Sequence, residues 1–419
     1  MDLITCLLLA LEACFAFWLL WHAGLLKTRK TFILSALLTA AAFLLRAACL
    51  PYETLDYKDF LSHWVAFYRE NMGFRSISYP LGNYNIPYLY FLCFFSYLPV
   101  RDLFLIKLLS IFFDVLLAFA AMQLFSLCGG NPKSRLLCFF TVLFLPTVVL
   151  NGALWGQCDS IYVALALLGL WLGLSERPAL SVACFALSFG FKLQAVFLLP
   201  IMAVLWFRGD YKLWHFALFP AVYVLLVLPA VLLGKPFLET ITLYLSQADS
   251  VGGGLNYNSP SIYAFFWRSP QTADAANLGI VGAFTLMLSL LLFCFFRRER
   301  LSARAVIAAA FLFAAGIPFL LPHMHDRYFF GADVLSVVLG FSCLFCIPCA
   351  LLLQYASLLS YYAYFRMRFL LYVDHGARAV IGALLLGFVQ LLHETAGKGG
   401  RQNFQKSENS SLTKPENLL

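Results

Sequence analysis

Apolar runs of roughly 20 residues, the length of an α-helix that crosses a bilayer, alternate with short polar segments along most of the chain. The pattern predicts about thirteen membrane-spanning helices, with the N-terminus outside and the C-terminus in the cytoplasm. The predicted spans are 2–26, 31–50, 103–127, 136–150, 161–175, 179–207 (two passes), 214–233, 278–296, 305–321, 331–347, 348–364 and 379–394. The stretch 87–99 is too short to cross and is expected to be re-entrant or interfacial.

The composition excludes a soluble enzyme. Hydrophobic residues make up 62% of the 419 positions and charged residues only 12%, whereas soluble domains carry about 25% charged residues. The predicted fold is therefore an all-α polytopic membrane protein, with one unit over 1–394 and a disordered cytoplasmic tail at 395–419. The net charge of +8 reflects basic cytoplasmic loops and does not indicate nucleic acid as a partner.

Two large loops, 51–102 and 234–277, are predicted on the outer side of the membrane. Polar residues that are unusual in such an apolar chain gather in or beside the outer segments. These residues are Asp56, Asp59, Trp155, Gln157, Asp159, Lys192, Asn256, Asn258, His323, His325 and Arg327. Cytoplasmic loops are short and basic, so we expect any active site to open outward.

Asp56 follows the second predicted span, at the edge of the bilayer. A carboxylate beside apolar walls can take a proton from an acceptor hydroxyl, as a general base does. A helix cap or a solvated loop acid is the alternative interpretation of this residue.

His323, His325 and Arg327 lie within five residues at the outer end of a predicted span. Arginine binds phosphate through paired hydrogen bonds, and histidine can donate to an anionic oxygen in either charge state. The alternatives are an interfacial anchor or a His-x-His metal site completed by Asp326 or Asp56.

Lys192 interrupts an apolar segment, where a charge is costly and usually functional. It needs an anionic partner, and either a phosphate or Asp159 would serve; snorkelling to the interface is the alternative. Lys107 and Asp114 are also intramembrane, lie on one helical face, and are expected to balance each other or Asp333.

Residues 82–88 and 256–263 combine amides, aromatic rings and a proline. Planar amides can read sugar hydroxyls and aromatic rings can stack on sugars, so both segments suit a carbohydrate, although asparagine and proline also abound in ordinary turns. The 12 cysteines lie almost entirely in apolar runs, which favours packing over metal binding.

Four motifs resemble those of the multi-span GT-C glycosyltransferases. They are Asp56-Tyr57 followed by His63-Trp64, Trp155-Gly156-Gln157-x-Asp159, Phe191-Lys192-x-Gln194 and His323-x-His325-Asp326-Arg327, in the expected order over residues 52–330. The chain most resembles the bacterial proteins related to the GPI-anchor mannosyltransferases. It is more distantly similar to the dolichyl-phosphate-glucose-dependent glucosyltransferases.

This resemblance implies a polyprenyl-phosphate-linked hexose donor, mannose or glucose, and a single inverting displacement on the extracytoplasmic side of a bacterial cell membrane. The acceptor would be a glycan, a lipid-linked molecule or a protein. By the same resemblance Asp56 is the base, and Lys192, His323, His325 and Arg327 hold the donor phosphate. Trp155, Gln157 and Asp159 would shape the sugar or donor pocket by this resemblance. We expect Tyr57 from the first motif, and Asn85 and Asn258 from the two amide-rich and aromatic segments, to join the sugar or acceptor pocket.

The sequence departs from these relatives in two places. The span 2–26 precedes the helix that leads to the acidic loop, and Asp59 is close enough to Asp56 to be the base itself or to help it hold a divalent cation. No cofactor is expected, and the relatives favour a metal-free mechanism.

Three other classes of protein stay open. A transporter or lipid flippase would line its path with Lys107, Asp114, Asp159 and Lys192. A polysaccharide polymerase or ligase would use a lipid-diphosphate donor, and a scaffold subunit would need none of these polar residues.

Overall fold

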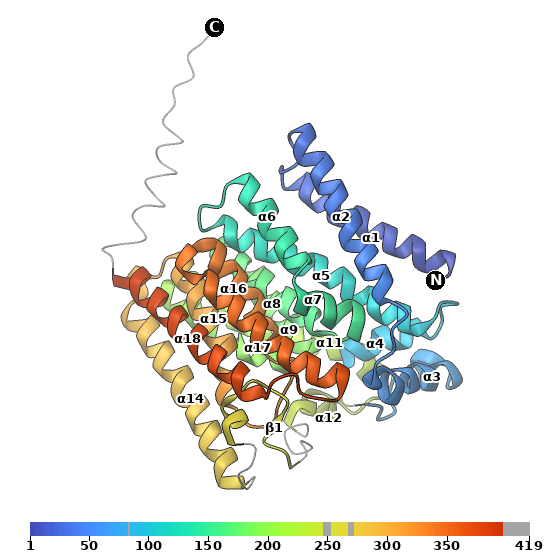
Figure 1. Ribbon diagram of the computed structural model, residues 1–419. Coiled ribbons are helices and arrows are strands. Elements are labelled where there is room, and N and C mark those ends of the chain that lie inside the picture. The colour runs from blue at the N-terminus through green and yellow to red at the C-terminus, as the bar shows by residue number, and fades with distance from the viewer. Residues whose placement is uncertain (83, 246–252, 267–271, 397–419) are drawn as a thin grey trace.

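The protein is an all-α helical bundle in the computed structural model, which describes residues 1–82, 84–245, 253–266 and 272–396 (Figure 1). The only strands in these ranges are β1 (Asn256–Tyr257) and β2 (Met324–His325), which pair in parallel. The predicted fold class is thereby confirmed. All but the first two residues of the predicted tail 395–419 lie outside the described ranges, and those two end the last helix.

Eight helices in the described ranges are long and apolar enough to cross a membrane. They are α1 (Leu3–His22), α2 (Arg29–Cys49), α5 (Asp102–Ser126), α11 (Leu218–Leu232) with the turn η5 (Leu213–Ala217), α14 (Ala273–Phe296), α15 (Ala303–Leu320), α17 (Ile347–Arg366) with η8 (Leu344–Cys346), and α18 (Val373–Ala396). A ninth span is formed if α6 (Pro132–Leu143) and the segment Pro146–Trp155, bent by 45°, are counted as one.

The predicted number of thirteen spans is not confirmed, because several apolar runs fold as helices too short to cross on their own. These are α8 (Asp159–Leu174), α9 (Pro178–Phe191), the segment Leu193–Arg208 with η4 (Leu193–Phe197) and α10 (Pro200–Arg208), and α16 (Phe330–Ser342). Helix α4 (Ile86–Phe95) is also short, as predicted for 87–99, and was not counted as a span. Helices α8 and α16 are largely buried inside the protein. Hydropathy alone cannot distinguish such a helix from a true span.

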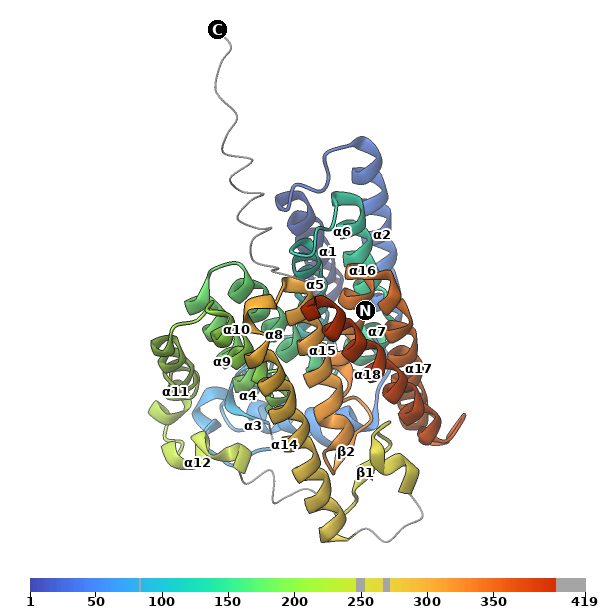
Figure 2. The same cartoon turned by 90° about the vertical axis from the view of Figure 1, so that its left-hand side faces the viewer.

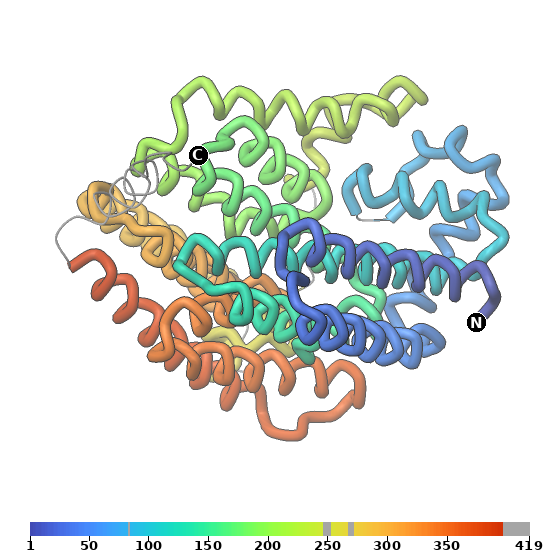
Figure 3. Tube along the Cα trace, turned by 90° about the horizontal axis from the view of Figure 1, so that it is seen from above, coloured from blue at the N-terminus to red at the C-terminus, as the bar shows by residue number. Residues whose placement is uncertain are grey.

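Helices α5 and α15 form the core of the bundle, whereas α14 and α11 are exposed along most of their length. Viewed from above, α11 and α17 lie on opposite sides of the molecule, with α5 and α8 between them (Figure 3). Helix α5 packs against α8, α6 and α1. It therefore borders both the N-terminal helices and the centre of the bundle.

The predicted outer loop 51–102 is mostly helical. It contains η1 (Tyr57–Leu61), α3 (Ser62–Glu70), η2 (Gly73–Ser76) and α4. The second predicted loop, 234–277, contains α12 (Phe237–Ile241), β1, η6 (Ile262–Phe266) and the start of α14, and its residues 246–252 and 267–271 lie outside the described ranges. Figures 1 and 2 show α3, α12 and β1 at the same end of the bundle.

A buried ion pair ties α2 to α5 inside the bundle. Arg46 Nη2 lies 3.0 Å from Asp114 Oδ2, and both side chains are fully buried. Arg46 also donates to the carbonyl of Leu143, and Ser160 donates to the other carboxylate oxygen of Asp114. The expectation that Lys107 and Asp114 balance each other or Asp333 was wrong, because each has protein partners of its own.

Replacing Arg46 with methionine is predicted to destabilise the protein by about 3–5 kcal/mol, because it leaves the Asp114 carboxylate buried without a counter-charge. Thermal unfolding in detergent would show this as a lower midpoint. The double variant Arg46→Met/Asp114→Asn should recover part of the loss. A single variant as stable as the wild type would contradict this assignment.

Candidate active site

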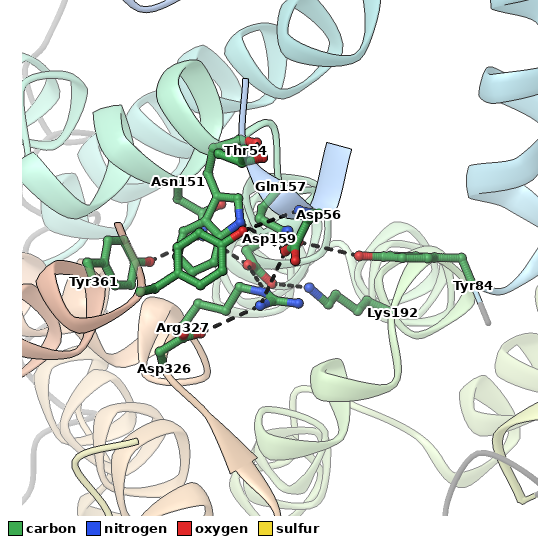
Figure 4. A network of polar contacts seen from close by, with 12 residues as sticks. Thr54, Asp56, Tyr84, Asn151, Gln157, Asp159, Lys192, Asp326, Arg327 and Tyr361 are labelled. Atoms are coloured by element: carbon green, nitrogen blue, oxygen red, sulfur yellow. Dashed lines mark hydrogen bonds and ion pairs between the residues drawn. The ribbon is translucent and has the colours of Figure 1, made fainter. Parts of the chain in front are cut away.

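A cavity of about 800 Å³ lies at the loop-rich end of the bundle and gathers the acidic and basic groups of three separate segments. The charged residues in its lining are Asp56, Lys192, Asp326 and Arg327. Aromatic and polar side chains complete the walls, and these are Phe60, Trp64, Tyr84, Asn85, Gln157, Phe191, Gln194, Tyr244, Tyr257, His325, Tyr328 and Tyr364. Figure 4 shows how the central side chains of this cavity point toward one another.

Asp56 lies immediately before η1, a π-helical turn, and its carboxylate reaches the cavity. Trp155 Nε1 and Gln157 Nε2 both donate to Asp56 Oδ2, at 2.9 and 2.5 Å. The backbone N–H of Asp56 donates to the hydroxyl of Tyr364 at 3.3 Å. Because both side-chain donors converge on Oδ2, Oδ1 is the oxygen better placed to accept a proton from a bound molecule.

The two donors to Asp56 are positioned by a π-helical turn, Leu150–Trp155, that ends at Gly156. Gly156 has φ +80°, a left-handed conformation that side chains other than glycine rarely adopt. The chain reverses there, so that Trp155 and Gln157 can both face Asp56. The Trp155 ring also stacks on Tyr364, with ring centroids 3.9 Å apart.

Asp159 begins α8 and is fully buried beside Lys192. Lys192 stands where α9 ends, in extended backbone, and its Nζ lies 2.5 Å from Asp159 Oδ1. Asn151 donates to Asp159 Oδ2 at 2.9 Å. The prediction that Lys192 has an anionic partner holds in this structure, and the partner is Asp159.

Arg327 lies among three carboxylates without a close hydrogen bond to any of them. Its shortest nitrogen–oxygen distances are 3.9 Å to Asp56, 3.6 Å to Asp159 and 3.5 Å to Asp326. Its Nε is buried and has no hydrogen-bond partner among the described residues. The guanidinium also lies 5.3 Å from the Trp155 ring centroid. Its donors are therefore available to an anionic ligand.

The two residues before Arg327 have strongly shifted proton affinities. Burial, with help from the Arg327 and Lys192 cations, lowers the pKa of His325 to about 3, so its imidazole is neutral at physiological pH. Burial raises the pKa of the Asp326 carboxyl to about 7. Since His325 is neutral, it can offer an anion a hydrogen bond but no charge.

Several residues of the predicted site lie elsewhere. Asp59 is exposed on η1 and is absent from the cavity lining. Tyr57 points away and donates to Asp102 at 3.2 Å. His323, at φ +62°, contacts the Gly254 carbonyl through Nδ1.

Asn258 lines a second, more apolar cavity beside α14, instead of the charged one. Asn85, by contrast, does line the charged cavity, and it also caps α4 and donates to Tyr223. The strand pairing of β1 with β2 explains why the His-x-His pair divides: His325 stacks on Tyr257 inside the cavity, whereas His323 joins the loop behind it.

Sequence reasoning missed two residues that complete the site, Tyr364 and Asn151, and assigned no individual role to a third, Tyr84. Tyr364 contacts Asp56 from α17, Asn151 contacts Asp159, and the hydroxyl of Tyr84 donates to Gln157 at 3.4 Å. Tyr84 belongs to the segment 82–88 that the sequence singled out for carbohydrate. Asn151 precedes the Trp155 motif by one helical turn, so its position was a usable signal, whereas nothing near Tyr364 in the sequence marks it.

Other polar residues considered in the sequence do not reach this cavity. Lys107 and Asp114 are fully buried in α5 and do not line it. Within the described ranges, no three His, Cys, Asp or Glu side chains are grouped so that they could hold a metal ion.

Residues 96–208 match the family model described as alpha-(1->6)-mannopyranosyltransferase, N-terminal domain. This match confirms the resemblance to GT-C mannosyltransferases. The match covers 113 of the 419 residues and supports a multi-pass membrane glycosyltransferase. The matched region contains Trp155, Gln157, Asp159 and Lys192, whereas Asp56 and Arg327 lie outside it. No curated protein matches the chain significantly.

Binding of an anionic lipid-linked sugar is predicted to weaken above pH 7, because ionisation of Asp326 adds a negative charge next to Arg327. Below pH 7 the carboxyl is neutral, and Asp56 and Asp159 are the acidic groups that remain near the guanidinium. The dissociation constant of polyprenyl-phosphate mannose in nanodiscs should rise by about 10-fold between pH 6 and pH 8.5.

The variant Asp326→Asn should remove this pH dependence, while the exposed Asp59→Asn should retain it. Equal pH dependence in the wild type and Asp326→Asn would show that another group is responsible.

Proposed function

We propose that this protein transfers a hexose, most simply mannose, from a polyprenyl-phosphate donor to an acceptor hydroxyl on the extracytoplasmic side of a bacterial cell membrane. The observation that carries the proposal is the arrangement of one cavity. Asp56 lies on its wall with a hydrogen-bonded carboxylate, and Lys192 and Arg327 supply positive charge beside it. These are the groups that a sugar phosphate and an activated hydroxyl require together.

The proposed reaction is a single displacement at the anomeric carbon. The acceptor oxygen attacks that carbon as its proton passes to Asp56, and a new glycosidic C–O bond forms. The bond between the anomeric carbon and the phosphate oxygen breaks with its electron pair, so polyprenyl phosphate leaves with one more negative charge. Lys192 and Arg327 stabilise that charge, His325 offers a neutral hydrogen bond, and the configuration at carbon inverts. The proposal includes no metal ion.

The charge distribution supports an extracytoplasmic site. Helix α14 ends at the basic turn Arg297–Arg300, and α15 leads from that turn to Arg327 at the other end of the bundle. Basic turns favour the cytoplasmic side. The cavity then faces the extracytoplasmic side. On that side lipid-linked sugars, and not nucleotide sugars, are the expected donors.

The positions and partners of the buried charged residues favour an enzyme over a transporter. A translocation path would be lined by intramembrane charges. Lys107 and Asp114 instead bond to protein groups away from the cavity. Asp159 and Lys192 pair with each other at one end of the bundle, where a sugar phosphate could be held.

Asp56→Asn is predicted to lower turnover by about 10²–10⁴-fold, because asparagine keeps the size of the side chain but cannot accept the proton. Transfer from radiolabelled polyprenyl-phosphate mannose would be measured with purified protein in nanodiscs and acceptors extracted from host membranes. Polyprenyl-phosphate glucose would be tested in parallel to identify the sugar.

Asp59→Asn is the matched control, since it makes the same change three residues away on an exposed surface. It should retain activity within about 2-fold. Loss of transfer in Asp59→Asn with normal transfer in Asp56→Asn would show that Asp59, and not Asp56, is the base. A wild type that binds the donor and transfers neither sugar would overturn the proposed function.

A further inference from the structure

One face of α5 holds three buried polar residues behind the cavity. Lys107, Ser110 and Asp114 are spaced by three and four positions, which places them on the same side of a helix. Asp114 belongs to the ion pair with Arg46. The contacts of the other two residues converge on the segments that carry Asp56 and its two hydrogen-bond donors.

The Lys107 ammonium binds the chain that leads into Asp56. Its Nζ donates to the carbonyls of Cys49, Leu50 and Tyr52, at 3.0, 3.1 and 2.5 Å. The last carbonyls of a helix lack intrahelical partners and carry partial negative charge. Lys107 therefore satisfies the C-terminal end of α2 and fixes the path of the chain four residues before Asp56.

The Lys107 side chain also packs against the segment that positions Trp155 and Gln157. A Cβ added at Gly156 would meet Lys107 Cγ at 3.4 Å, so the lysine stem lies directly beside this glycine. One turn along α5, Ser110 donates to the Gln157 carbonyl at 2.7 Å. Thr54 closes the arrangement by donating to the Trp155 carbonyl at 3.2 Å.

We propose that Lys107 is a positioning residue that fixes the position of Asp56 relative to its hydrogen-bond donors Trp155 and Gln157. This inference rests on the proposed role of Asp56 as the base. The Lys107 side chain contacts both segments. Its ammonium binds the segment that leads to the Asp56 carboxylate, and its aliphatic stem packs against the turn that carries Trp155 and Gln157. A displacement of about 1 Å between such groups can cost roughly 10²-fold in rate.

Lys107 does not reach the cavity, so its effect should fall on turnover and leave donor binding intact. The variant Lys107→Met keeps the length of the stem and removes the ammonium. We expect kcat to fall by about 10- to 100-fold, with the KM for polyprenyl-phosphate mannose within about 3-fold of wild type, because Lys192 and Arg327 are unchanged. Should this variant not fold, Lys107→Gln carries the same expectation.

A double-variant cycle separates positioning from general damage. In an Asp56→Asn background, adding Lys107→Met should reduce the residual transfer by less than about 2-fold, because there is no base left to position. A purely structural role would lower the activity of both backgrounds equally, and that result would overturn the inference.

Lys235→Met is the matched control. Its ammonium also donates to loop carbonyls, those of Ile77 and Tyr79, but it does not line the cavity or contact Asp56. It should retain kcat within about 2-fold.

The outcomes distinguish the two proposals. Full activity in Asp56→Asn refutes the proposed base and with it this inference. Loss of activity in Asp56→Asn with an unchanged kcat in folded Lys107→Met refutes the positioning role alone.

Discussion

The contact between Asp159 and Lys192 is the interaction on which the rest of the site depends. Two opposite charges lie 2.5 Å apart and largely buried in the helical bundle, where neither could remain ionised alone at reasonable cost. Their pairing joins the start of α8 to the break at the end of α9. It also places negative charge 3.6 Å from Arg327, so the guanidinium of the loop between α15 and α16 is drawn to the same point.

This arrangement leaves the positively charged guanidinium of Arg327 available to a ligand. Arg327 is surrounded by carboxylates, but each lies beyond hydrogen-bond distance. A phosphate that enters the cavity can therefore gain direct hydrogen bonds from the guanidinium without breaking strong ones. The same phosphate would draw Arg327 away from Asp56, which leaves that carboxylate freer to take a proton. In the proposed reaction, donor binding and activation of the base would be coupled through this one side chain.

Much of the site could be predicted from the sequence, because charges in apolar segments are few and the alternation of helices determines the end at which each emerges. Asp56, Lys192 and Arg327 were expected in one site, and they line the same cavity. The division between His323 and His325 could not be predicted, since it depends on a two-residue strand pairing between distant loops. The contacts of Tyr364 with Asp56 and of Lys107 with the chain before Asp56 could not be predicted either, because they depend on the packing of α17 and α5. The number of spans was overestimated for a related reason, because short helices buried in protein have the hydropathy of true spans.

The most direct test of the account is a cryo-electron microscopy structure of the protein in nanodiscs with a non-transferable phosphonate analogue of polyprenyl-phosphate mannose. The account predicts the phosphonate within hydrogen-bond distance of Lys192 and Arg327, and the sugar between them and Asp56, with its anomeric carbon facing the carboxylate. A head group bound outside this cavity, or a sugar whose anomeric carbon faces away from Asp56, would contradict it.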